Sequence, residues 1–181
     1  YDTLLEVYFD GQGYAQKDEI VQVKKYHKNP NMWDYFLRTR IAVDRLEDLL
    51  DEKEGNLDKV QMLFADMEER EEAWKELERE GVFELVGSLQ YNIEINAAGV
   101  NKGTGLVNLG KMLGIRREEI MACGDGDNDI AMLKEVGFGV AMANAEEKVK
   151  AAADYITESN NEEGAAKAIE KFVLKRGGES C

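Results

Sequence analysis

Three aspartates and an asparagine stand close together in the second half of the chain, directly after a short apolar stretch. Residues 120–133 read IMACGDGDNDIAML. An apolar strand that runs straight into a helix, with oxygen ligands at the junction, is a common way for α/β proteins to place a divalent cation. Asp125 would lie at the strand tip, and Asp129, four residues later, on the same face of the helix. Two carboxylates held that close need a cation between them, so the spacing predicts a metal site and favours phosphate chemistry.

Two other interpretations of these acids stay open. A single Asp or Asn after a strand is often only a turn residue or a helix N-cap. A calcium-binding EF-hand loop also places acids at its first, third and fifth positions, as Asp125, Asp127 and Asp129 are placed here. The residues at its glycine and glutamate positions are Ile130 and Val136, however, and a strand precedes the cluster. A calcium-binding module is therefore the less favoured alternative.

Lys102 is a second residue whose position could serve chemistry. Asn101-Lys102-Gly103 opens a predicted helix, and the free N–H groups at a helix N-terminus favour an anion. A lysine that faces a bound cation would neutralise a phosphoryl group held between the two. A plain surface role is the alternative, because most lysines are exposed.

The elements that would position these residues alternate regularly from about residue 99 onward. Short apolar strands alternating with helices predict right-handed crossovers on a parallel sheet. Ligands of such sheets lie beyond the carboxyl ends of the strands, where residues 124–129 fall. The expected helices are 102–113, 128–136, 146–152 and 164–174, and the expected strands are 120–123, 139–142 and 155–157.

The first half of the chain predicts a small α+β unit. Apolar or alternating residues predict strands at 4–9, 60–65 and 91–95. One amphipathic helix would bury Val43, Leu46, Leu49 and Leu50 and stop at Gly55-Asn56. A second helix would be capped by Asp66 and end at Gly81, with the acidic run 68–80 as its solvated face.

Composition limits the partners and the compartment. The net charge is −14, which argues against nucleic acid and against an anionic membrane surface. No apolar run approaches the roughly 20 residues that span a bilayer, and the N-terminus does not resemble a signal peptide. The two cysteines, Cys123 and Cys181, form neither a disulfide framework nor a CxxC site. We therefore expect a cytoplasmic protein with a small-molecule partner.

Four segments together resemble a known family. They are VNKG at 100–103, GDGDNDIAML at 124–133, GVAMANA at 139–145 and the segment 160–164. This combination is similar to the third and fourth motifs and the C-terminal end of Cof-type haloacid dehalogenase-like phosphatases, and it covers nearly all of 99–172. The resemblance implies that residues 98–181 are the C-terminal part of a Rossmann-like α/β core. Residues 1–97, a weaker match, would be part of an α+β cap domain of the C2B type.

The resemblance also implies roles for single residues. Lys102 would contact the nucleophile and the substrate phosphate, and Asn128 would also contact that phosphate. Asp125 would be the direct ligand of the cofactor Mg²⁺, and Asp129 an acidic catalytic partner at the metal site. The implied activity is hydrolysis of a small phosphorylated metabolite, such as a sugar phosphate, through an aspartyl-phosphate.

One part of the family pattern is missing from these residues. The family attacks phosphorus with the first aspartate of an N-terminal Asp-x-Asp and uses the second as general acid and base. No Asp-x-Asp precedes Asp125, and near Asp10 the nucleophile position holds Tyr8. We therefore expect the C-terminal part of such a phosphatase, inactive alone, whose sheet edge relies on the missing N-terminal segment or on another chain. The alternative is a non-catalytic remnant that binds a metabolite or a partner protein.

Overall fold

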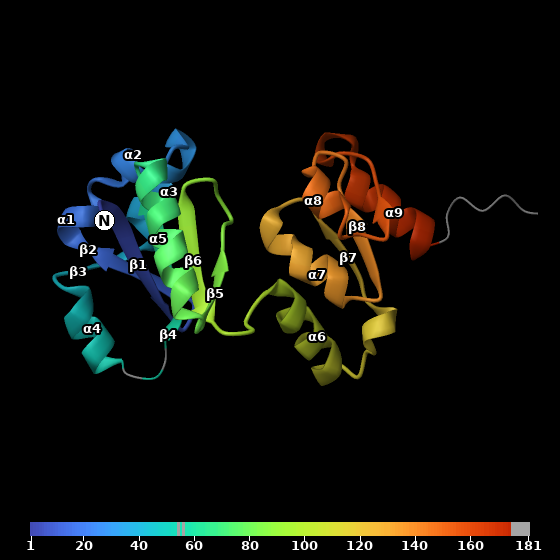
Figure 1. Cartoon of the computed structure of the whole chain (residues 1–181), viewed down its shortest axis with the longest axis horizontal. Helices are drawn as coiled ribbons and strands as arrows, with labels where there is room; N and C mark the ends of the chain where they lie inside the picture. Colours follow the sequence, from blue (N-terminus) through green and yellow to red (C-terminus); the bar gives the residue numbers. More distant parts are fainter. Residues whose placement is uncertain (54, 56, 175–181) are drawn as a thin grey trace, which may run out of the picture. The chain divides into compact units, whose positions relative to one another are not determined.

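The computed structural model describes residues 1–53, 55 and 57–174, so Asn56 and Cys181 lie outside the described residues. The chain forms two compact units, Tyr1–Gly99 and Val100–Cys181 (Figure 1). We call them unit 1 and unit 2 and describe each by itself. Their boundary lies two residues after the end of the predicted cap segment. Among the described residues, no helix has the length and apolar character needed to cross a membrane.

Unit 1 is built on a six-stranded sheet in the order β3-β2-β1-β4-β6-β5. Only β2 and β3 pair in parallel; the other neighbours are antiparallel. The hairpin between β1 and β2 turns at Asp10 and Gly11, which both have positive φ, as a tight hairpin turn requires. The strands are β1 (Thr3–Phe9), β2 (Gln12–Gln16), β3 (Ile41–Val43), β4 (Leu57–Phe64), β5 (Phe83–Val86) and β6 (Asn92–Ala97).

Helices cover both faces of this sheet because its strands carry apolar side chains on both sides. Leu4 of β1 packs among the short helices α1 (Lys17–Ile20), α2 (Val23–Tyr26) and α3 (Trp33–Thr39). Val7 and Phe9 point to the opposite face and pack against α4 (Leu46–Glu52). The same face is continued by α5 (Met67–Glu80), which lies along β4, β5 and β6. Unit 1 therefore has a core on each side of one sheet.

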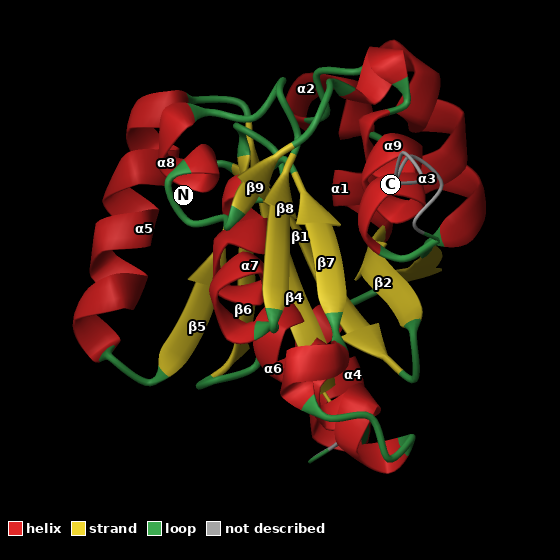
Figure 2. Cartoon of the chain, turned by 90° about the vertical axis from the view of Figure 1, so that its right-hand side faces the viewer, coloured by secondary structure: helices red, strands yellow, loops and turns green. Residues whose placement is uncertain are grey.

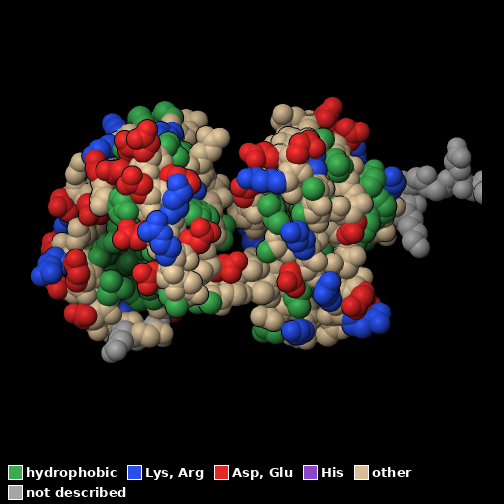
Figure 3. All heavy atoms as spheres, viewed as in Figure 1, with side chains coloured by type: hydrophobic (Ala, Val, Ile, Leu, Met, Phe, Trp, Pro, Cys, Tyr) green, Lys and Arg blue, Asp and Glu red, His purple; other side chains and the backbone are tan. Residues whose placement is uncertain are grey.

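The helix α5 begins and ends where the sequence predicts. Asp66 is its N-cap and accepts hydrogen bonds from the N–H groups of Glu68 and Glu69, and Gly81 ends it with a φ of 65°. Ala73 is buried against the sheet, whereas most of the acidic residues of the helix are exposed. Figure 3 shows acidic and basic side chains interspersed on the face of unit 1 where α5 lies. The predicted solvated face is confirmed.

Two expectations for the first half are wrong. Val43 lies in β3 instead of the following helix, because it pairs in parallel with Gln16, an arrangement that suits a β-branched residue. The helix α4 begins at Leu46 and ends at Glu52, before the predicted stop at Gly55-Asn56. Val43 still packs beside Leu49 and Leu50, so the apolar pattern identified the shared core while misplacing one member.

A buried carboxylate lies on the face of the unit 1 sheet that α1, α2 and α3 cover. Glu6 of β1 is fully buried and accepts hydrogen bonds from Arg40 Nε (2.8 Å), Gln61 Nε2 (3.1 Å) and Tyr8 Oη (2.9 Å). Burial, together with the negative charge of Glu6, raises the pKa of Tyr8. Every partner of Glu6 is a donor, which is what a buried ionised carboxylate requires.

The described part of unit 2 contains three parallel strands in the order β7-β8-β9 (Figure 2). All seven predicted elements are present, and none of their ends differs from the expected bounds by more than two residues. One difference concerns the acid cluster: residues 127–129 form a 3-10 turn, so the helix after β7 begins at Ile130. The strands are β7 (Met121–Gly124), β8 (Phe138–Ala141) and β9 (Tyr155–Ile156); the helices are α6 (Lys102–Met112), α7 (Ile130–Glu135), α8 (Glu147–Lys150) and α9 (Gly164–Phe172).

Apolar contacts fix the helices of unit 2 to its sheet. Leu133 of α7 and Val149 of α8 pack with Ala141 of β8 on one side. The ring of Phe172 in α9 contacts the rings of Phe138 and Tyr155 at centroid distances of 4.7 and 4.9 Å. These contacts hold α7, α8 and α9 against the sheet whose strand pairing sets the register.

Candidate active site

The first turn of α6 presents Lys102. Asn101 caps the helix through its Oδ1, which accepts hydrogen bonds from Gly103 N (2.9 Å) and Thr104 N (3.0 Å). This cap fixes Lys102 as the first helical residue. Lys102 Nζ lies 2.6 Å from Asp129 Oδ1. The structure therefore joins two of the predicted site residues, which are separated by 27 positions in the sequence.

Asp129 is the buried centre of the acid cluster, with only 6% of its surface exposed. Its Oδ2 accepts hydrogen bonds from Asp125 N (2.9 Å) and Gly126 N (3.0 Å). Burial alone would raise the pKa of Asp129, but the hydrogen bonds from Lys102 and these two N–H groups outweigh it and lower the pKa. A Cβ on Gly124 would come within 2.5 Å of Asp129 Cβ. A glycine at the strand tip is therefore needed for this carboxylate to fold back over the loop.

Asp125 is exposed at the carboxyl end of β7. Its Oδ2 accepts a hydrogen bond from Asn144 Nδ2 at 2.9 Å. Asn144 in turn accepts one from the backbone N–H of Asn160 at its Oδ1, also at 2.9 Å. These contacts tie Asp125 to the loops that follow β8 and β9.

The other two residues of the cluster have different surroundings. Asp127 is exposed and pairs with Lys148 Nζ at 2.5 Å, a surface ion pair that contributes little to stability. Asn128 is half-buried. Its Oδ1 lies 2.7 Å from the place where a Cβ on Gly126 would be, so its side chain lies over the loop backbone.

A cation site here would use few protein ligands. Among the residues that the structure describes, no group of three or more His, Cys, Asp or Glu side chains could hold a metal ion. Mg²⁺ usually keeps several waters and takes only one or two carboxylates together with substrate phosphates. The exposed carboxylate of Asp125 fits that requirement. The charge of Asp129 is paired with that of Lys102.

The four predicted site residues thus lie at one edge of unit 2, around the tip of β7 and the first turn of α6. Neither Asn144 nor Lys148 is among the site residues expected from the sequence, yet they contact Asp125 and Asp127. The signal that points to Asn144 is its position three residues after the end of β8, because the carboxyl ends of parallel neighbours share one edge of the sheet.

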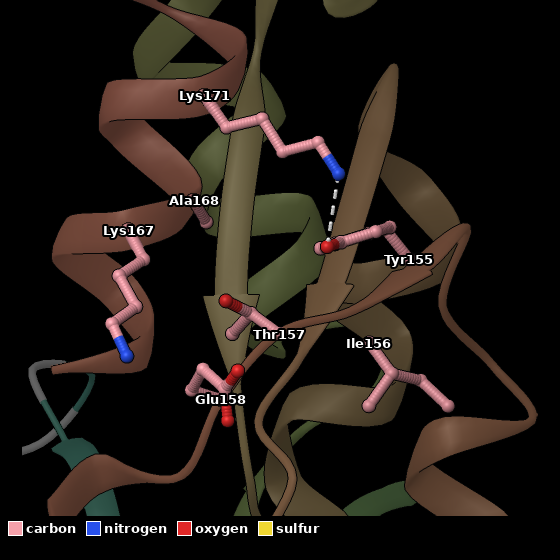
Figure 4. Close-up of a pocket in the computed structure, with 7 residues that line it drawn as sticks. All are labelled: Tyr155, Ile156, Thr157, Glu158, Lys167, Ala168 and Lys171. Carbon is pink, nitrogen blue, oxygen red and sulfur yellow. Dashed lines mark hydrogen bonds between the residues drawn. The ribbon is translucent and has the colours of Figure 1, made fainter. Parts of the chain in front are cut away.

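A separate hollow of about 200 Å³ lies between β9 and α9 (Figure 4). Lys171 Nζ crosses it and donates a hydrogen bond to Tyr155 Oη at 3.1 Å. None of the predicted site residues lines this pocket. The candidate site is therefore an exposed edge and not this pocket.

A family model of haloacid dehalogenase-like hydrolases matches residues 3–169. The matched segment spans most of both units and includes all four predicted site residues. The chain belongs to this family. The predicted family and the predicted α/β fold class are confirmed, and the motif segments of this haloacid dehalogenase-like chain are those that form the edge described above.

Two curated relatives of the haloacid dehalogenase-like chain are named as phosphatases. The chain is 50% identical over 105 residues to the 5-amino-6-(5-phospho-D-ribitylamino)uracil phosphatase YcsE of Bacillus subtilis. This aligned segment covers 58% of this chain and 42% of that protein. It is 42% identical over 88 residues to the phosphoglycolate phosphatase of Methanosarcina acetivorans, which covers 49% of this chain and 38% of that protein. The chain thus spans less than half the length of these two relatives.

Solved structures share the fold over nearly the whole chain. A haloacid dehalogenase-like hydrolase from B. subtilis superposes with a TM-score of 0.77 at 27% identity, covering 96% of this chain and 66% of that one. The subclass IIB sugar phosphatase BT4131 gives a TM-score of 0.73 at 25% identity, covering 94% of this chain and 60% of that one. Both neighbours are longer than the haloacid dehalogenase-like chain described here.

Proposed function

We propose that these 181 residues belong to a Mg²⁺-dependent phosphatase of small phosphorylated metabolites and form the part that holds the cation and the substrate phosphate. The observation that carries the proposal is the pair of Lys102 and Asp129 beside the exposed carboxylate of Asp125. A positive and a negative group at one sheet edge suit a phosphate bridged to a cation. The names of the curated relatives support the reaction class, and the sugar phosphatase among the neighbours supports the substrate class.

Each residue has a distinct task in this proposal. Asp125 is the direct ligand of Mg²⁺, which when bound would offset the negative charge of the phosphoryl oxygens. Lys102 would contact the phosphoryl group with its charged Nζ, and Asn128 would donate a hydrogen bond to it. Asp129 holds Lys102 in place through its Oδ1 and braces the loop through its Oδ2. The buried Asp129 is thus a residue that orients the others at the metal site.

The attacking carboxylate lies outside these residues in our proposal, because no Asp-x-Asp precedes Asp125. In the complete protein that carboxylate attacks phosphorus, the alcohol leaves, and water then hydrolyses the aspartyl-phosphate. Residues 98–181, which include unit 2, are then the C-terminal part of the α/β core, and residues 1–97 are part of the cap. The cytoplasmic setting stays a prediction.

Calorimetric titration of the 181-residue chain with Mg²⁺, with and without inorganic phosphate, tests the half-site. We expect Mg²⁺ binding that strengthens with phosphate and is lost in Asp125→Ala. The matched control is Asp127→Ala, an exposed acid of the same loop, which should keep it. If the wild-type chain binds neither Mg²⁺ nor inorganic phosphate, the non-catalytic alternative is favoured. Tight calcium binding that does not respond to phosphate would favour the calcium module.

A phosphatase assay of the same chain tests where the nucleophile lies. We expect no turnover of small phosphate esters. Turnover that Asp125→Ala abolishes would show instead that the chain supplies its own nucleophile, and would remove that part of the proposal while leaving the cation site in place.

A further inference from the structure

One side-chain amide connects the three loops that follow the strands of unit 2. Asn144 lies in the loop after β8. Its Nδ2 donates a hydrogen bond to Asp125 Oδ2 (2.9 Å) in the loop after β7. Its Oδ1 accepts one from Asn160 N (2.9 Å) in the loop after β9. A single residue thus spans the whole carboxyl edge of the sheet.

The hydrogen-bond partners leave only one orientation for this amide. The backbone N–H of Asn160 can only donate, so it must face the Oδ1 of Asn144. The ionised carboxylate of Asp125 can only accept, so it must face the Nδ2. Turning the amide over would bring two donors together on one side and two acceptors on the other. The direction in which Asn144 acts on Asp125 is therefore defined by its partners.

Backbone hydrogen bonds hold the loop that carries Asn144. Met142 N donates to Gly124 O at 3.0 Å, and Ala143 N donates to Glu158 O at 3.3 Å. These bonds join the β8 loop to the strand ends on both sides of it. The backbone that carries Asn144 is therefore held in place. The hydrogen bond from Asn144 can restrict the carboxylate of Asp125, because Asn144 does not move freely with that carboxylate.

The three acids of the cluster differ in what contacts their carboxylates. Asp127 is paired with Lys148, and Asp129 with Lys102. In the described part of the chain, Asp125 is held by the neutral amide of Asn144 and has no lysine or arginine partner. Its negative charge is therefore the one in the cluster that still lacks a positive partner, while the direction of its Oδ2 is already set.

We propose that Asn144 is a positioning residue for the cation: it fixes Oδ2 of Asp125 so that the carboxylate is presented in one rotamer, with its charge left for Mg²⁺. The inference rests on the cation site of the proposed function. A neutral donor suits this task, because a lysine in its place would offset the charge that attracts the cation. Loss of an outer hydrogen bond to a metal ligand typically costs 10-fold to 100-fold in metal affinity.

Calorimetric titration with Mg²⁺ of the wild-type chain and of Asn144→Ala tests the affinity. Because Asn144 and Asp125 are both exposed, we expect a loss at the lower end of that range, about 10-fold. The matched control is Asn108→Ala, an exposed asparagine of α6, which should bind as the wild type does. Equal Mg²⁺ affinity in Asn144→Ala and in the wild type would overturn the inference. If Asn144→Ala does not fold, the less disruptive Asn144→Ser takes its place.

Amide nuclear magnetic resonance during the same titration separates positioning from loop stability. In the wild type, Mg²⁺ should shift the side-chain NH₂ signals of Asn144 and the backbone N–H signal of Asn160, and the second shift should vanish in Asn144→Ala. Shifts at residues 125–129 without any at Asn144 or Asn160 would overturn the role of Asn144 alone. A wild-type chain in which Mg²⁺ shifts none of these signals would remove the cation site, and the inference with it.

Discussion

At the scale of single residues, Lys102 and Asp129 form an ion pair whose two side chains differ in their exposure to solvent. The side chain of Lys102 is 51% exposed, whereas that of Asp129 is 8% exposed. A lysine that loses its partner is hydrated by water, but a buried carboxylate that loses its lysine keeps only the two loop N–H groups. The energetic consequence of breaking the pair therefore depends on which partner is removed.

Lys102→Met should lower the free energy of unfolding of unit 2 by about 1–2 kcal/mol, because the buried charge of Asp129 is left with fewer partners. The half-exposed position of the lysine keeps the loss below that of a fully buried pair. Urea unfolding followed by fluorescence or circular dichroism measures it. Lys111→Met, an exposed lysine of the same helix, is the control. An equal change in both variants would contradict the importance of the Asp129 contact.

His27 is buried at 3% exposure in unit 1. Its ring contacts those of Phe36 and Tyr91 at centroid distances of 4.6 and 5.4 Å, and its Nδ1 accepts a hydrogen bond from Asn29 N at 3.3 Å. Burial lowers the pKa of His27 below its ordinary value of 6.5. The unfolded chain therefore binds a proton at a higher pH than the folded chain does, so acid favours unfolding.

Unit 1 should lose stability as the pH falls through 6.5, and the loss should level off below the lowered pKa of folded His27. His27 is the only histidine of the chain, so His27→Gln should abolish most of the slope between about pH 7.5 and about pH 5.5. Urea unfolding at several pH values gives this slope. A variant that keeps the wild-type slope would show that other groups cause it.

At the scale of elements, the packing of α6 against α7 depends on a close backbone approach. A Cβ on Gly103 would lie 2.8 Å from the carbonyl oxygen of Ala131 and 2.8 Å from Cγ of Glu135. Gly105, half a turn further along α6, has nothing within 4 Å of its Cβ position. The first glycine sets the distance between the helices, while the second only weakens the helix.

Gly103→Ala should destabilise unit 2 by about 1–3 kcal/mol. The added methyl group would clash with the backbone of α7, so α6 and α7 would have to move apart to make room for it. The matched variant Gly105→Ala should stabilise it by about 0.5–1 kcal/mol through helix propensity. Differential scanning calorimetry of both variants measures the difference. A loss of the same size in both would mean that α6 is restrained at Gly105 too.

At the scale of the whole molecule, the described cores are confined to single units. The three clusters on the sheet of unit 1 draw all their residues from 1–99, and the cluster of unit 2 draws its residues from 130–153. In the part of the chain that the structure describes, the six strands of unit 1 pair with one another. Unit 1 thus has the core and the sheet that an independent folding unit needs.

A chain of residues 1–99 should therefore fold alone and unfold cooperatively in urea, with dispersed amide signals. A chain of residues 1–81 is the control, because it lacks β5 and β6 and leaves the β4 edge and Phe64 without their neighbours. It should be unfolded or aggregate. A 1–99 chain without a cooperative transition would show that unit 1 needs residues beyond its own.

The sequence by itself determined the local features of this protein. The caps of α5, the alternation of strands and helices after residue 99, and the acid cluster at the tip of β7 all follow from signals that act within a few residues. The resemblance of the motif segments identified the family, which the family model confirms. Local periodicity and capping can be seen in a single sequence because they need no knowledge of what lies next to them.

Only the tertiary structure decided which of these residues meet. Asn144 reaches Asp125 across 19 positions, and Arg40 reaches the buried Glu6 across 34. Nothing in the local pattern of either segment marks such a partner, because strand order and loop position determine the contact. Val43 was misplaced for the same reason: its pairing with β2 outweighs the helical spacing that it shares with Leu46. The sequence located the candidate site, and the fold assigned each carboxylate in it a different partner.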